Sequence, residues 1–138
     1  MPDMLLGIDF GTKRIGLALG STLTAAARPL SVLANNGAFF DQLNQIIKEW
    51  QVTQIILGLP LNMDGEEQEI TRQVKNFSKK LKHQCQLPVS FVDERLSSFE
   101  AERQFKSLRQ NNQAKVKDKD QIDAIAAQII LQSFLDSE

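Results

Sequence analysis

Three carboxylates occupy positions that are unusual for surface acids. Asp9 interrupts an apolar stretch near the N-terminus, Glu94 follows a short apolar run, and Asp123 opens a long apolar segment. Removing a carboxylate from water costs several kcal/mol or more unless a partner compensates its charge. If the fold brings these acids together, they would repel one another unless divalent cations held them. Such an oxygen-rich site suits Mg²⁺ or Mn²⁺, with phosphate completing the coordination shell.

Each acid also has an ordinary structural explanation. Asp9 could accept hydrogen bonds from the backbone that follows it, as turn-forming aspartates do. Glu94 could pair with Arg95 at the surface, and Asp123 could be a first-turn acid favoured by the helix dipole. Taken one at a time, these explanations are at least as good as a catalytic one, so both remain open. Only the three acids together favour a shared metal site.

Other kinds of catalytic site lack the residues they need. His83 is the single histidine and Cys85 the single cysteine, which argues against a Ser-His-Asp triad and against a zinc centre. We expect His83 to be exposed and Cys85 to be a chance thiol without a nucleophilic role. The Gly-x-x-x-x-Gly-Lys phosphate loop is also absent.

The first third of the chain predicts three strands, two of which form a hairpin. Residues 4–10 are an apolar run with Asp9 inside it, and residues 14–19 carry Ile15, Leu17 and Leu19 in alternation. A short polar link joins the two strands. A third strand is expected over 25–33. Because proline cannot donate to a central ladder, Pro29 places that strand at a sheet edge.

The remaining pattern alternates helices with short apolar strands. A helix is predicted over 39–50, a strand over 54–59, a second helix around 70–81 and a strand over 89–92. Ser97 and Glu100 have capping-box spacing for a third helix ending near Leu108, and a polar loop follows over 109–119. An apolar last helix is expected over 121–135. This order predicts an α/β fold with a mixed five-stranded sheet, in which three antiparallel strands precede two parallel crossover strands, flanked by helices.

The composition indicates one globular domain over residues 1–138. Hydrophobic residues make up 42% and charged residues 24%, which are ordinary globular values. We expect a cytoplasmic protein without a membrane span or signal peptide. A lone cysteine fits a reducing compartment.

Charge is distributed unevenly along the chain, although the net charge is only −1. From Arg72 to Lys119 there are twelve Lys and Arg residues against five acids, a local balance of +7. Such a segment could form a basic face that binds nucleic acid, or simply a solvated surface.

Four motifs together resemble the YqgF family of nucleases. They are LLGIDFGTKRIG at 5–16, LGLPLNMDG at 57–65, VDERLSS at 92–98 and IDAIAAQIIL at 122–131. Any one of them would be weak, but the four occur in order and with compatible spacing over nearly the whole chain. The family is described both as Holliday-junction resolvase-like and as pre-16S rRNA nucleases. The resemblance implies an RNase H-like fold.

Carried over to this chain, the resemblance implies that Asp9, Glu94 and Asp123 are the metal-binding and catalytic acids. It favours Asp123 over Asp120, which lies three residues earlier, because the family acid directly precedes the small-residue run. Asp120 could assist or substitute. Further residues are implied in substrate binding, either at phosphates, in the active-site loop or in a segment closing over nucleic acid: Lys13, Arg14, Arg95, Asn62, Asp64 and Lys119. Gly11 and Gly16 would let backbone approach the site closely.

The resemblance implies two-metal hydrolysis of a phosphodiester with Mg²⁺ or Mn²⁺ as cofactor. Structured RNA, above all precursor 16S rRNA in ribosomal precursor particles, is the favoured substrate, and branched DNA is the alternative. A resolvase would require a dimer with two sites, whereas an RNA-trimming enzyme could be a monomer or a homodimer. An alternative hypothesis is a non-catalytic RNA-binding assembly factor. Another is an ATP-binding module of the actin and sugar-kinase type, although the chain has room for only one of the two domains that such enzymes use.

Overall fold

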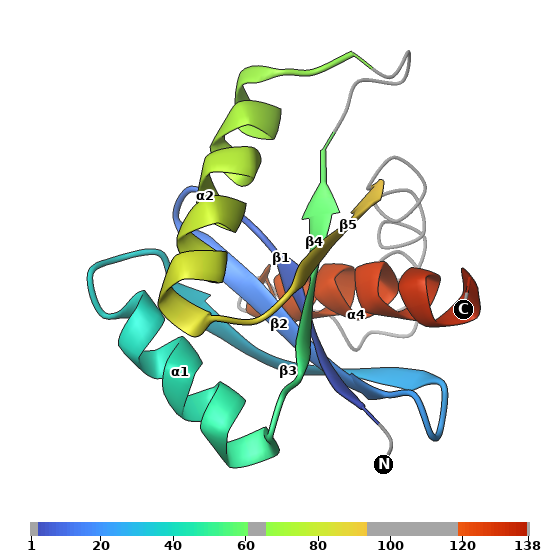
Figure 1. The fold of residues 1–138 in the computed structure, drawn as a ribbon. Coiled ribbons are helices and arrows are strands. Elements are labelled where there is room, and N and C mark those ends of the chain that lie inside the picture. The colour runs from blue at the N-terminus through green and yellow to red at the C-terminus, as the bar shows by residue number, and fades with distance from the viewer. Residues whose placement is uncertain (1–2, 61–65, 94–118, 138) are drawn as a thin grey trace.

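The computed structural model describes residues 3–60, 66–93 and 119–137. Within these ranges the chain forms five strands and three helices (Figure 1). The strands are β1 (Met4–Asp9), β2 (Arg14–Ser21), β3 (Ala26–Ala34), β4 (Gln54–Leu59) and β5 (Val89–Asp93). The helices are α1 (Phe39–Trp50), α2 (Glu69–Cys85) and α4 (Lys119–Ser137).

All five strands belong to one mixed sheet, in the order β3-β2-β1-β4-β5. Strands β1, β2 and β3 pair antiparallel, whereas β4 runs parallel to β1, and β5 parallel to β4. The predicted mixed sheet is therefore confirmed. The edge position of β3 is confirmed as well, and Pro29 lies beside a register shift in that strand, where a missing N–H is tolerated.

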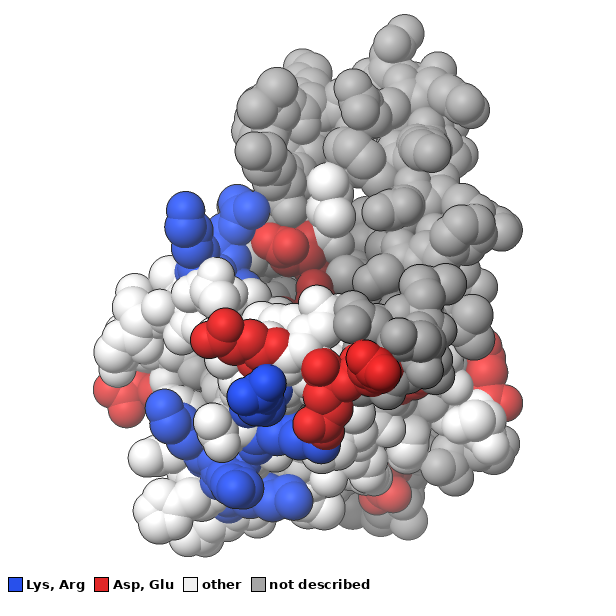
Figure 2. All heavy atoms as spheres, turned by 90° about the horizontal axis from the view of Figure 1, so that it is seen from above, with Lys and Arg blue, Asp and Glu red and all other residues white. Residues whose placement is uncertain are grey.

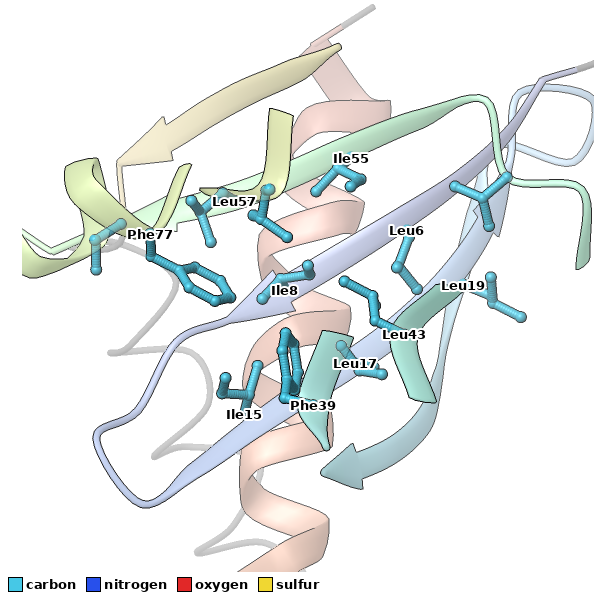
Figure 3. Packing of buried hydrophobic residues seen from close by; sticks show 13 residues of the cluster. Leu6, Ile8, Ile15, Leu17, Leu19, Phe39, Leu43, Ile55, Leu57 and Phe77 are labelled. Carbon is cyan, nitrogen blue, oxygen red and sulfur yellow. The ribbon is translucent and has the colours of Figure 1, made fainter. Parts of the chain in front are cut away.

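The two faces of the sheet are covered by different helices (Figure 1). Helices α1 and α2 pack on one face and α4 crosses the other. Strand alternation divides the side chains between them: Leu6 and Ile8 point toward α1 and α2, whereas Leu5 packs with α4. Figure 3 shows how strand and helix side chains meet on the α1 and α2 face. The fully buried large side chains are Leu5, Leu6, Ile8, Ile15, Leu17, Leu19, Phe39, Leu43, Ile55, Ile56, Leu57 and Leu81.

Two glutamines of α4 bind the backbone of the edge strand. Gln132 accepts a hydrogen bond from the Ala27 N–H and donates one to the Ala25 carbonyl, both at 2.9 Å. Gln128 donates to the Ala27 carbonyl at 3.0 Å. These bonds satisfy groups that an edge strand otherwise presents to solvent or to another chain. They also fix α4 at its C-terminal half, the end away from Asp123.

Most element boundaries agree with the sequence prediction within two residues. Strand β1 ends at Asp9, so this acid closes the strand and does not lie inside it as predicted. Helix α4 begins at Lys119, two residues earlier than expected. The predicted helix from Ser97 to Leu108 lies outside the described residues. None of the described helices is long and apolar enough to span a membrane.

Replacing Thr71 by valine should lower the free energy of unfolding by about 1–3 kcal/mol. Thr71 is fully buried at the start of α2. Its hydroxyl donates to the Pro60 carbonyl and accepts from the Gln68 N–H at 2.9 Å. Valine keeps the shape but leaves the Pro60 carbonyl and the Gln68 N–H, both in part-buried hydrogen bonds, without this partner. Urea unfolding measures the change.

A matched control is Thr53→Val, because Thr53 is exposed and its hydroxyl donates a long hydrogen bond of 3.4 Å to the Met4 carbonyl. This variant should stay within about 0.5 kcal/mol of the parent. Equal losses in the two variants would show that the Thr71 hydroxyl does not hold the start of α2.

Candidate active site

Asp9 lies at the end of β1 on the face covered by α4. Strand alternation puts Leu5, Gly7 and Asp9 on that face, and Leu5 belongs to the apolar cluster around α4. The residue is partly buried. In the central part of an open sheet, the carboxyl end of a strand that pairs with a parallel neighbour is the usual place for ligands to gather. Asp9 therefore occupies a position suited to binding.

Gly16 brings α4 directly beside this position. In the antiparallel register Gly16 is the partner of Asp9. A Cβ atom built on Gly16 would lie only 2.0 Å from the carbonyl oxygen of Asp123 and 3.1 Å from the Ala124 nitrogen. The backbone of α4 thus rests on the bare surface of Gly16. Asp9, through strand pairing, and the backbone of Asp123, through close packing, are consequently both neighbours of Gly16.

Gly7 allows a second close approach farther along α4. A Cβ on Gly7 would lie 2.9 Å from the Ala127 carbonyl oxygen and 2.7 Å from the Cβ of Leu131. Two glycines on neighbouring strands therefore allow α4 to pack closely against the sheet. The sequence predicts that Gly16 permits close backbone approach, and the approaching backbone is that of α4. The sequence does not predict the contact at Gly7, because that contact depends on how α4 crosses the sheet.

Asp123 forms an ion pair with Arg14, the first residue of β2. The Arg14 Nε lies 3.3 Å from Asp123 Oδ2. The side chains are 43% and 28% exposed, so the pair is solvated and contributes little to stability. Its chief effect is to orient the Asp123 carboxylate toward the start of β2. Asp123 is the fifth residue of α4, so a first-turn dipole role does not explain it.

Comparison with known proteins places the chain in a family. Residues 3–137 match the family described as RuvX: Holliday junction resolvase. The chain belongs to the RuvX family. This confirms the resemblance found in the sequence and the predicted enzyme class, a nuclease that hydrolyses phosphodiester bonds.

Relatives of the RuvX chain carry a more specific name. A protein of Dechloromonas aromatica named "Putative pre-16S rRNA nuclease" is 39% identical over 135 residues, covering 96% of this chain and 90% of the relative. A protein of the same name from Burkholderia ambifaria (strain MC40-6) is 42% identical over 134 residues, with 96% and 88% coverage.

Solved structures confirm the RNase H-like fold of the RuvX chain. RuvC of T. thermophilus in complex with a Holliday junction superposes with a TM-score of 0.59, covering 98% of this chain and 94% of RuvC. A second T. thermophilus RuvC structure gives 0.54, with 96% of each chain covered. The sequence identities are 14% and 11%, so this likeness concerns the fold alone.

The structure locates only some of the predicted site residues of the RuvX chain. Asp9 and Asp123 both adjoin Gly16, and their role as metal ligands stays a prediction. Lys13 is exposed in the β1–β2 turn. Lys119 and Asp120 begin α4. The predicted residues that lie outside the described ranges are Glu94, Arg95, Asn62 and Asp64.

Arg14 contacts Asp123 in the structure, and the phosphate-binding role predicted for Arg14 stays a prediction. Period-two alternation already puts Arg14 on the same face as Gly16, but the sequence does not show that α4 passes there. Gly11 is needed in the hairpin, and the close approach of backbone to the site that it would allow stays a prediction. A Cβ on Gly11 would lie 2.3 Å from the Arg14 carbonyl oxygen, so the tight hairpin itself requires this glycine.

The remaining chemical groups of the described chain do not compete with this site. His83 is exposed at the end of α2. Burial raises the pKa of the Cys85 thiol to about 11, so thiolate is scarce at neutral pH and the residue is a poor nucleophile. Among the described residues no three His, Cys, Asp or Glu side chains are grouped to hold a metal ion. The predicted third acid, Glu94, falls outside those residues.

Proposed function

We propose that this protein is a divalent-metal-dependent nuclease that processes the 5′ end of precursor 16S rRNA. The observation that carries the proposal is that Asp9, at the end of β1, and the α4 backbone at Asp123 both adjoin Gly16. The name shared by relatives at 37–42% identity over almost the whole chain supports RNA as the substrate. The proposal implies a cytoplasmic protein whose partners are RNA and ribosomal precursor particles.

The donor set fits Mg²⁺ or Mn²⁺. Both cations prefer carboxylate oxygens, and the two described acids come from a rigid strand and a rigid helix. In this proposal Asp9 and Asp123 hold the metal together with Glu94, which directly follows β5 in the sequence. When bound, the ions would lower the pKa of water and neutralise charge developing on the phosphate.

The protein's own groups orient this site and attract the substrate. The Arg14 guanidinium holds the Asp123 carboxylate toward β2, and Gly16 fixes the distance between helix and sheet. Lys13 extends from the turn beside the site, where an ammonium group attracts phosphate. Along α2, four of the five basic residues are exposed, and Lys75 pairs with Glu67. Viewed from above, Lys and Arg gather on the left half of the described surface, with acids near its centre (Figure 2).

A nuclease assay tests the proposal. Purified wild type is incubated with precursor 16S rRNA in Mg²⁺ or Mn²⁺, beside Asp9→Asn and the matched control Asp3→Asn, whose exposed acid lies at the other end of β1. We expect Asp9→Asn to lose about 100-fold or more in rate, because an amide cannot replace a ligating carboxylate. Asp3→Asn should cleave like wild type. Equal residual activity in wild type and Asp9→Asn would indicate a contaminant and overturn the proposal.

Cleavage of branched DNA is the second candidate, favoured by the family description. The same assay on a four-way junction, with mass measured in solution, separates the two. Paired cuts by a dimer would favour the DNA substrate. Processing of the RNA without junction cleavage under the same conditions would overturn branched DNA as the substrate.

A further inference from the structure

A hollow of about 420 Å³ lies on the α1 and α2 face, behind the strand end that carries Asp9. Its volume falls in the range of roughly 300–1,000 Å³ that is typical of small-ligand sites. Among the described residues, no carboxylate lines it. The lining residues are Phe10, Asn35, Asn36, Phe39, Phe40, Gln73, Asn76, Phe77 and Lys80.

Four phenylalanines form the apolar part of the hollow. Phe39 and Phe77 are buried beneath it, and Phe10 and Phe40 are partly exposed. The rings of Phe10, Phe39 and Phe40 lie 4.7, 5.6 and 5.9 Å from that of Phe77, centroid to centroid. Figure 3 shows the Phe39 and Phe77 rings close to the ends of β1 and β2. Flat apolar rings at a surface suit a flat aromatic ligand, such as a nucleobase.

The rim of the hollow carries polar groups able to recognise such a ligand. Four carboxamides supply both hydrogen-bond donors and acceptors, as the edge of a base requires. Within the described chain, the side chains of Gln73, Asn76 and Lys80 make no hydrogen bond or ion pair. An aliphatic side chain of a protein partner would cover these amides without satisfying them, which is costly. Lys80 adds a positive charge suited to a phosphate.

The hollow and the candidate active site are joined through one short segment. Phe10 directly follows Asp9, and strand alternation sends the two side chains to opposite faces of the sheet. Asn35 on the rim donates from Nδ2 to the Gly11 carbonyl, and its N–H donates to the Lys13 carbonyl, both at 2.9 Å. The turn that carries Lys13 is thus fastened to the rim. A strand passing over this end of the sheet would reach both places.

We propose that the hollow binds one unpaired base of the RNA strand that is cleaved at Asp9. The inference rests on the proposed nuclease function and adds to it a preference for a single-stranded nucleotide next to the cleavage point. The base stacks on Phe10 and Phe40 and bonds to the amides of Gln73 and Asn76. A base within a duplex cannot enter, so the hollow selects unpaired ends.

Binding of RNA in EDTA tests this without requiring catalysis. The probe is a fluorescent single-stranded RNA of about ten nucleotides, compared with the same strand containing abasic positions. We expect the full chain to bind the abasic strand roughly tenfold more weakly, because stacking and edge contacts are lost. Equal binding of the two strands would overturn the proposal. Free ATP binding as tightly as the strand would overturn the assignment to RNA.

Two variants assign the effect to the hollow. Gln73→Ala/Asn76→Ala and, separately, Phe40→Ala should each show a smaller difference in affinity between the two strands than wild type, since each removes part of the base site. The matched control Gln84→Ala changes an exposed amide on the same helix outside the hollow and should discriminate like wild type. Full discrimination by the folded double variant would overturn the proposal.

The two proposals can fail separately. If the wild type cleaves RNA in the Asp9-dependent assay but binds both strands equally, only the proposal of a base site is overturned. If the wild type prefers the intact strand but cleaves nothing, the base site is supported and the proposed nuclease activity is overturned.

Discussion

Replacing Gly16 by alanine is expected to lower the melting temperature by about 10 °C and to remove most nuclease activity. The added Cβ would lie 2.0 Å from the Asp123 carbonyl oxygen, so it meets helix backbone and not a flexible side chain. Helix α4 must then move off the sheet. Overpacking of this kind costs about 3 kcal/mol at the upper end of its usual range, and for a chain of this length that corresponds to the stated shift.

Activity should fall even at temperatures where the Gly16→Ala variant is fully folded. Moving α4 changes the position of Asp123 relative to Asp9, and a displacement of about 1 Å is enough to impair catalysis strongly. Thermal unfolding and cleavage rate at a low temperature separate the two effects. A folded variant with wild-type activity would show that the spacing of helix and sheet at this point is not critical.

Gly37→Ala is the matched control for this substitution. A Cβ on Gly37 meets no atom within 4 Å. The same chemical change should therefore alter stability by less than about 0.5 kcal/mol and leave activity intact. A similar loss at Gly37 would mean that glycine flexibility, and not close packing on α4, governs both positions.

The sheet and its helices could be predicted from the sequence because they depend on local hydrophobic patterns. Alternation at Ile15, Leu17 and Leu19 identifies β2, and Pro29 identifies an edge strand because proline lacks the donor a central strand needs. The same alternation places Asp9 and Arg14 on one face of the sheet. These features survive in the structure with shifts of one or two residues at the ends of elements.

The contacts that build the site could not be predicted in the same way. Arg14 and Asp123 are more than a hundred residues apart in the chain, and their ion pair depends on the path of α4 across the sheet. The close packing of α4 on Gly7 and Gly16 can be recognised only when the pairing of β1 with β2 is known. The aromatic hollow likewise gathers Phe10, which follows β1, with residues of the β3–α1 connection, α1 and α2. Within its own segment, each of these residues has the pattern of ordinary core or surface.

Asp123→Asn is expected to reduce cleavage about 100-fold or more while changing the free energy of unfolding by less than about 1 kcal/mol. The two magnitudes differ because the Arg14 pair is solvated, with side chains 43% and 28% exposed. Asparagine still fits beside Gly16 and still accepts a hydrogen bond from Arg14. It lacks the charge that a divalent cation requires.

A measurement independent of turnover separates a metal ligand from a residue that only positions the helix. A bound cation raises the melting temperature of the folded protein by mass action. We expect Mn²⁺ to stabilise wild type and to stabilise Asp123→Asn less at the same concentration. The matched control Asp136→Asn makes the same change at an exposed acid near the other end of α4 and should respond like wild type. If Asp123→Asn lost activity but kept the full Mn²⁺ response, Asp123 would act on substrate or on helix position, and the metal site would have to be built from other acids.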